Sequence, residues 1–299
     1  MGMVNCDWIG KKYSDGKVAL EDIKICIEQG EKVGLVGPMG AGKTTLLRLL
    51  AGVLNATSGT LQIGVEKNEI AYMPASKGLI RALTVREHIK MWANAFGARK
   101  EYIDYIIETL KLEKILAKEI RHLSSGMQTL VSFGCTVLGK PQLVLLDEPF
   151  VHLDMNSCLK IEEIIQTFLS DSSIVISSHD LERMEELSDT LLVIDSGKQI
   201  FCNETKKLKE IYGNEFFKIH FEEKVSMQVQ SNLQVQYGGN FIDSSTVYFS
   251  KKRISVDLAK NLLLKDGCKI KEVQVSCSEL KDIYLNIICG EAVSYTHLR

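Results

Sequence analysis

Residues 37–44, Gly-Pro-Met-Gly-Ala-Gly-Lys-Thr, form the segment that most constrains the fold of this 299-residue chain. They match the pattern G-x-x-x-x-G-K-[ST] between an apolar stretch at 32–36, typical of a strand, and a leucine-rich stretch at 46–50, typical of a helix. Glycines let backbone N–H groups approach phosphate oxygens, Lys43 adds a positive charge, and Thr44 offers a hydroxyl to Mg²⁺. The segment predicts a site for the phosphates of a nucleotide. The residues expected to bind them are Gly37, Pro38, Met39, Gly40, Ala41, Gly42, Lys43, Thr44 and Thr45.

A second candidate segment is the apolar run 143–146 with Asp147 and Glu148 directly after it. Buried parallel strands are apolar throughout, so this run predicts a central strand whose carboxyl end carries two acids. Because ligands of α/β sheets bind outside the carboxyl ends of the strands, we expect both acids beside the 37–44 segment. Asp147 suits a role next to Mg²⁺, and Glu148 suits positioning and deprotonating an attacking water.

The first two thirds of the chain alternate short apolar strands with helical stretches, as parallel strands joined by crossovers do. Further strands are expected at 174–177 and 191–194, and helices at 103–110 and 161–168, where apolar residues recur with helical spacing. Residues 84–87 fit a capping box, so a helix is predicted to begin at Val85. These patterns indicate an α/β domain over residues 1–213.

After about residue 213 the apolar period changes to two. Alternation predicts strands at 217–221 and 233–237, and helices at about 256–265 and 278–289 flank a further strand at 270–276. We therefore expect a small α+β domain over residues 214–292. Residues 293–299 resemble translated sequencing-adaptor read-through, so we expect a non-native tail and the loss of the natural C-terminus.

Composition narrows the class of protein. Hydrophobic residues at 45% and charged residues at 25% are typical of soluble globular chains. No apolar run approaches the roughly 18 residues that span a bilayer, and the N-terminal residues lack a signal-peptide pattern, so we expect a cytosolic chain. A net charge of −2 argues against a nucleic-acid partner. The eight cysteines have no paired or metal-ligand spacing, and we expect reduced thiols that mostly fill the core.

Over about residues 13–201 the chain resembles the ATP-binding subunits of ABC transporters. Residues 123–127, Leu-Ser-Ser-Gly-Met, are similar to the family signature L-S-G-G-Q and depart from it at the third and fifth letters. The resemblance implies that Ser124 and Gly126 of one protomer contact the γ-phosphate held by another. At the same place Ser125 and Gln128 predict a second capping box at the start of a helix.

Three more residues match motifs of this family. Asp154 resembles the aspartate of the loop that crosses between protomers, and His179 resembles the histidine that touches the γ-phosphate and orients the water. Tyr13 resembles the aromatic residue that stacks on adenine. The implied catalytic residues are thus Lys43, Glu148 and His179, with Thr44 and Asp147 at the metal.

The resemblance implies a P-loop NTPase fold of the ABC type with a helical subdomain at about 76–138, followed by the C-terminal α+β domain. It implies ATP and Mg²⁺ as ligands, a second ATP-binding cassette in a homodimer or heterodimer, and a membrane-spanning permease as partners. The chain would lie peripherally on the inner face of the cell membrane and power export.

One family residue is missing. The position after the strand that ends at Pro74 generally carries glutamine, and this chain has Ala75. We therefore expect low basal turnover. Two other functions are weighed against a transport motor: an ATP-binding regulator with little turnover, and a soluble ABC protein that acts on ribosomes or DNA.

Overall fold

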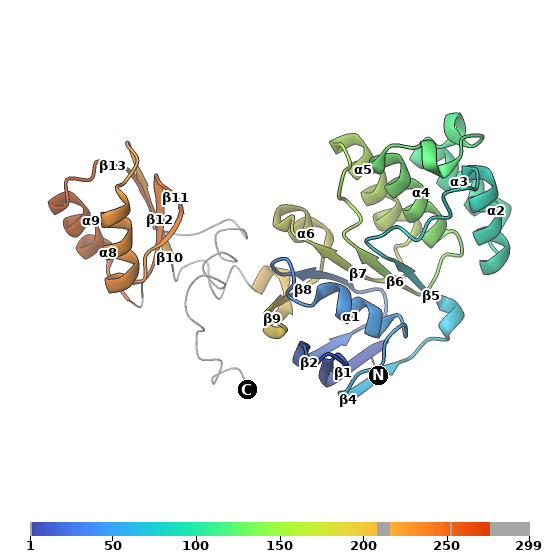
Figure 1. The fold of residues 1–299 in the computed structure, drawn as a ribbon, viewed down its shortest axis with the longest axis horizontal. Helices are drawn as coiled ribbons and strands as arrows, with labels where there is room; N and C mark the ends of the chain where they lie inside the picture. The colour runs from blue at the N-terminus through green and yellow to red at the C-terminus, as the bar shows by residue number, and fades with distance from the viewer. Residues whose placement is uncertain (1, 208–215, 252, 276–299) are drawn as a thin grey trace. The chain divides into compact units, whose positions relative to one another are not determined.

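The computed structural model describes residues 2–207, 216–251 and 253–275, and the structural statements below refer to them. The chain divides into two compact units, residues 1–202 and 203–299, which we treat separately (Figure 1). The predicted domain boundary between residues 213 and 214 lies outside the described residues and stays a prediction.

The first unit is built on a nine-stranded sheet in the order β4-β1-β2-β9-β8-β3-β7-β6-β5. β3 pairs in parallel with β7 and β8, and β6 pairs in parallel with β5 and β7, while β1 pairs antiparallel with β2 and β4. The carboxyl ends of β3, β6 and β7 therefore meet at one edge of the sheet. The strands are β1 (Val4–Lys12), β2 (Val18–Ile27), β3 (Lys32–Val36), β4 (Ser58–Ile63), β5 (Ile70–Met73), β6 (Leu143–Asp147), β7 (Ser173–Ser178), β8 (Thr190–Asp195) and β9 (Lys198–Glu204).

The strands predicted at 32–36, 143–146, 174–177 and 191–194 are confirmed as β3, β6, β7 and β8. Every residue of β6 and β7 is buried, and the runs 143–146 and 174–176 within them are apolar, as is typical of buried parallel strands. The predicted α/β class is likewise confirmed.

Helices connect these strands, and α2, α3 and α4 lie within the predicted helical segment 76–138. Figure 1 shows them grouped beside the β5–β6 end of the sheet. The predicted start at Val85 is confirmed, because Thr84 Oγ1 accepts from the Glu87 N–H and the Glu87 carboxylate accepts from the Thr84 N–H. Within the described part of the chain, no helix has the length and apolarity needed to cross a bilayer. The helices are α1 (Lys43–Leu50), α2 (Val85–Phe96), α3 (Lys100–Leu110), α4 (Ser125–Val137), α5 (Met155–Glu163), which continues as a π-helical turn (Ile164–Phe168), and α6 (Leu181–Leu187).

The second unit has the element order β-α-β-β-α-β and an antiparallel sheet in the order β11-β12-β10-β13, the arrangement of ferredoxin-like domains. Phe217 stacks on Phe249 in its core, with ring centroids 5.4 Å apart. The predicted helix at 278–289 lies outside the described residues. The elements are β10 (Phe216–Phe221), α8 (Met227–Tyr237), β11 (Asn240–Asp243), β12 (Thr246–Ser250), α9 (Val256–Lys265) and β13 (Ile270–Gln274).

The strand predicted at 233–237 is wrong, because these residues end helix α8. Ser226 caps the helix by accepting from the Val229 N–H, and Gly238 ends it in a left-handed conformation. Only Leu233 of the alternating residues is buried, whereas Val235 is 82% exposed. The core contacts are made by Val229, Leu233 and Tyr237, which recur every four residues, so the helical period governs the segment.

Several cysteines fill the interior, as expected for small apolar side chains: Cys6, Cys135 and Cys158 are buried. Burial raises the pKa of the Cys6 and Cys135 thiols to about 12, so both stay protonated at neutral pH. Cys26 is the exposed exception. Cys277 and Cys289 lie outside the described residues.

Candidate functional site

The loop between β3 and α1 has a shape that depends on its glycines. Gly40 and Gly42 have φ values of 81° and 109°, in the left-handed region that favours glycine. A Cβ on Gly37 would lie 2.1 Å from the Ile194 carbonyl oxygen, so a side chain does not fit there. No side chain caps the first turn of α1, which leaves backbone N–H groups for a ligand. An uncapped helix start behind a glycine loop fits a bound phosphate group.

Lys43, at the start of α1, reaches back over this loop. Its ammonium donates to the carbonyl oxygens of Gly37 and Pro38 over 2.6 and 3.2 Å and lies 3.8 Å from Glu148 Oε1. The Lys43 side chain is only 10% exposed. The positive charge is therefore held between the loop and a carboxylate at the end of β6.

Asp147, the last residue of β6, is buried. Asp147 is 1% exposed, and its carboxylate accepts from the hydroxyls of Thr44 and Ser177, each over 2.8 Å. A buried carboxylate costs free energy unless it is hydrogen bonded or binds a cation. The Thr44 hydroxyl and the Asp147 carboxylate are both hard oxygen ligands, so this donor set fits Mg²⁺.

Glu148 extends the same cluster toward β7. Its N–H donates to both the carbonyl and the hydroxyl oxygen of Ser177, at 3.2 and 2.9 Å, and its backbone has a φ of 53°. Its Oε2 lies 3.0 Å from Nδ1 of His179, whose side chain is 73% exposed. The structure thus brings Lys43, Thr44, Asp147, Glu148 and His179 together at the carboxyl ends of three strands, as the sequence predicts.

Tyr13 lies beside helix α1. Its hydroxyl is 3.1 Å from Thr45 Oγ1, one residue after Thr44. The ammonium of Lys11 lies 5.7 Å from the centroid of the Tyr13 ring. An aromatic ring is therefore placed beside the helix that follows the loop.

Ser124, Gly126 and Asp154 form a second group, and within the described part of the chain their side chains make no hydrogen bond to residues 37–45. All three line one cavity of about 560 Å³. Ser124 caps α4 by accepting from the Met127 N–H, and Asp154 caps α5 by accepting from the Ser157 N–H. The capping box predicted from Ser125 and Gln128 is wrong, because α4 begins one residue earlier. The Gln128 amide instead donates to the carbonyls of Ile120 and Leu123.

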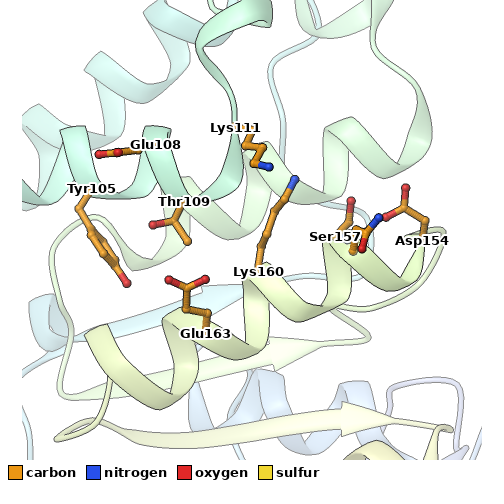
Figure 2. A pocket seen from close by; sticks show the side chains of 9 residues that line it. Tyr105, Glu108, Thr109, Lys111, Asp154, Ser157, Lys160 and Glu163 are labelled. Carbon is orange, nitrogen blue, oxygen red and sulfur yellow. The ribbon is translucent and has the colours of Figure 1, made fainter.

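A larger cavity of about 860 Å³ lies between α3 and α5. Figure 2 shows Lys111 and Lys160 pointing toward each other across it, with Asp154 at one end. No residue of the 37–45 segment lines it, nor do Asp147 and Glu148. The cavity is therefore separate from the phosphate loop.

Ser177 was missed by the sequence analysis, although one hydroxyl there bonds to Asp147 and to the N–H of Glu148. The sequence pattern that could have identified Ser177 is weak. Ser177 and Ser178 follow the apolar run 174–176 at the end of a buried strand, which places polar groups at the same edge as the other site residues.

Comparisons with known proteins agree with this geometry. The family model described as ABC transporter matches residues 20–151. An uncharacterised ABC transporter ATP-binding protein, MJ1023 of Methanocaldococcus jannaschii, is 35% identical over 194 residues, which cover 63% of this chain and 73% of that protein. The uncharacterised ABC transporter ATP-binding protein YhaQ of Bacillus subtilis is 28% identical over 294 residues, 95% of this chain and 97% of YhaQ.

Among solved structures, a dimeric post-hydrolysis state of the ATP-binding cassette MJ0796 bound to ADP and Pi matches with a TM-score of 0.63 and 20% identity. The match covers 68% of this chain and 99% of that one. At this identity it supports the fold alone. The fold, the loop and the sequence relatives together define an ATP-binding cassette with the P-loop NTPase fold. The chain belongs to the family of ABC transporter ATP-binding proteins.

Proposed function

We propose that the chain hydrolyses ATP and that the cycle of binding and hydrolysis powers export through a separate membrane-spanning permease. The observation that carries this proposal is the cluster that joins Lys43, Thr44, Asp147, Glu148 and His179 by contacts of 2.8–3.8 Å. Such a cluster supplies a phosphate-binding cation, hard metal ligands and a general base within one site.

ATP binding would draw on the loop residues 37–45 and on Tyr13. Lys43 would exchange its loop carbonyls and Glu148 for phosphate oxygens, and the uncapped N–H groups of α1 would bind the others. Thr44 and Asp147 would hold Mg²⁺, which neutralises phosphate charge when bound.

Glu148 would take the proton of the attacking water, since its carboxylate is held next to Lys43 and His179. His179 is exposed on the outer side of this carboxylate, where it would contact the γ-phosphate and keep the water in place. The Ser177 hydroxyl fixes the backbone from which Glu148 projects.

A second cassette would complete each site. Ser124, Gly126 and Asp154 share a cavity that neither Lys43 nor Glu148 lines, so one chain alone would leave them without a nucleotide partner. We infer that Ser124 and Gly126 bind the γ-phosphate held by a second copy or a related cassette, and that Asp154 lies between the two. MJ0796, which shares the fold, is a dimer in its post-hydrolysis state.

The permease would be contacted through the loop 75–83, which precedes α2. Ile80 in this loop is 47% exposed and offers an apolar contact. The chain would then lie peripherally on the cytoplasmic face of the membrane. Ala75 favours one alternative, a regulator that binds ATP with little turnover, because a methyl group cannot hold the metal or the water.

The test is MgATP binding by calorimetry to the wild-type chain and to the Lys43→Ala variant, with Lys90→Ala, an exposed lysine on α2, as the matched control. We expect Lys43→Ala to abolish binding or nearly so and Lys90→Ala to bind as wild type. Undiminished affinity in the Lys43 variant would contradict the phosphate site. Steady-state phosphate release then separates a motor from a regulator, and roughly 20-residue apolar spans in the adjacent reading frame would identify the permease.

A further inference from the structure

Lys77, in the loop after β5, is bound at both of its ends to helix α4. Its ammonium donates to the carbonyl oxygen and the hydroxyl of Ser125, over 2.6 and 2.8 Å. Its own carbonyl accepts from the Ser132 hydroxyl over 2.7 Å, and Ser132 is buried. Residues seven apart in a helix lie on one face, about two turns from each other. Lys77 therefore contacts one face of α4 at two points about two turns apart.

The loop adopts a costly backbone to make these contacts. Lys77 and Gly78 have φ values of 69° and 59°, and the Lys77 N–H closes a turn onto the Pro74 carbonyl over 2.7 Å. The left-handed region is unfavourable for lysine, since its Cβ crowds the backbone. Such conformations persist when surrounding contacts determine them, and they cluster at functional sites.

Coulomb attraction does not explain the position of the ammonium. Within the described residues no carboxylate pairs with Lys77, and partial burial lowers the pKa of its ammonium. The first turn of α4 also holds no acid, and a cation is unfavourable at a helix N-terminus. The side chain is held there by hydrogen bonds to Ser125, at a cost that a solvent-exposed lysine would avoid.

Lys77 stands between the two groups of site residues. β5 lies beside β6, with Met73 opposite Leu146, so the loop starts next to Asp147. The Lys77 ammonium, in turn, is hydrogen bonded to Ser125, which lies between Ser124 and Gly126. Ser125 is a departure from the family signature, and its hydroxyl is one of the two acceptors of Lys77.

We propose that Lys77 is a positioning residue that makes the loop 74–83 and the first turn of α4 move as one unit, and thereby aims Ser124 and Gly126 at the nucleotide of the second cassette. This inference rests on the proposed function of Ser124 and Gly126. In this chain the link through Lys77 and Ser125 accompanies the loss of the glutamine at position 75. Movement of the loop by a membrane partner would reach the phosphate-contacting turn through it.

The test uses the full chain and the variants Lys77→Met, Lys77→Arg, Ser125→Ala and the double variant Lys77→Met/Ser125→Ala, with Lys90→Met as the matched control. Calorimetry gives the MgATP Kd, phosphate release gives kcat and KM, and hydrogen exchange gives the protection of amides 124–128. We expect the Kd to stay within about twofold of wild type in every variant, because Lys77 does not touch the loop 37–45. Lys77→Met should lower kcat about tenfold and speed exchange at 124–128 by a similar factor, as expected when hydrogen bonds from a charged group are lost.

Lys77→Arg should restore most of kcat, and Lys90→Met should match wild type in every measurement. The double variant should have a kcat no lower than that of Lys77→Met, since both substitutions remove the same hydrogen bond between Lys77 and Ser125. Wild-type kcat and unchanged exchange in Lys77→Met, or additive losses in the double variant, would overturn the proposal. If the wild type binds ATP without hydrolysing it, the motor function fails, and the exchange at 124–128 still decides whether Lys77 holds α4.

Discussion

Replacing Glu148 by glutamine is expected to separate ATP binding from hydrolysis. Glutamine keeps the size of the side chain and a hydrogen-bonding oxygen, but it cannot take a proton from water. The hydrogen bond between the Glu148 N–H and Ser177 belongs to the backbone and survives the change. We therefore expect the site to keep its shape and lose its base.

The size of the effect follows from two interactions. Loss of a general base typically costs about 10² to 10⁴ in rate, or roughly 2.7 to 5.4 kcal/mol in activation free energy. The affinity for ATP, by contrast, should increase. Glu148 Oε1 lies 3.8 Å from the ammonium of Lys43, an attraction of about 4 kcal/mol before desolvation at an effective dielectric constant of about 20. If about 1 kcal/mol of it remains net, freeing Lys43 tightens ATP binding about fivefold.

Three measurements test this expectation: phosphate release at saturating MgATP, calorimetry, and light scattering with and without MgATP. The variant should hydrolyse ATP at least about 10²-fold more slowly than wild type while it binds ATP at least as tightly and accumulates as a dimer. Glu186→Gln is the control, since Glu186 is an exposed residue of α6 outside the cluster. Turnover within about tenfold of wild type would refute the assignment of Glu148 as the base. A strict monomer in MgATP would argue against closure of two cassettes.

Three further outcomes are expected. Ala75→Gln should raise basal phosphate release severalfold, and an unchanged rate would show that Ala75 does not limit turnover. A fragment that ends at Gly213 should bind MgATP with wild-type Kd by calorimetry, unless the second unit contributes to the site. His88 is fully buried and burial lowers its pKa, so the unfolded state binds more protons below about pH 6.5. Stability to urea should fall by at most about 1.4 kcal/mol per pH unit below that value, and His88→Leu should remove this fall.

The parts of the fold that the sequence predicted are those set by local patterns. The glycine loop, the all-apolar strand before Asp147 and the capping box at Thr84 each depend on residues close together in the chain. Parallel pairing then brings distant strand ends to one edge without further information. This is why Lys43, Asp147 and Glu148 could be placed in one cluster before their contacts were known, whereas His179 was assigned by its resemblance to a family motif.

The helix α8 shows where such patterns fail. Alternation of Leu233, Val235 and Tyr237 fits a strand, but three residues cannot distinguish a period of two from one of four. The deciding signals were Ser226 before the segment and Gly238 after it, which cap the helix at both ends. End signals therefore outweigh a short apolar period when the two disagree.

The contacts that tune the site lie beyond any local pattern. Ser177 is 30 residues from Asp147, and Lys77 is 48 residues from Ser125. Such pairings depend on which side chains the finished sheet and helices bring within about 3 Å, and no spacing rule predicts them.

The backbone of Glu148 shows how much depends on such a contact. Its φ of 53° costs about 1 to 2 kcal/mol for a residue with a side chain, and it turns the carboxylate out of line with β6 toward Lys43 and His179. Ser177 stabilises that turn by accepting from the Glu148 N–H while its hydroxyl donates to Asp147. One side chain on β7 thus orients both acids at the end of β6, the proposed metal ligand Asp147 and the proposed base Glu148. Because the two acids share this support, we expect loss of the Ser177 hydroxyl to disturb the proposed metal site and the proposed base together.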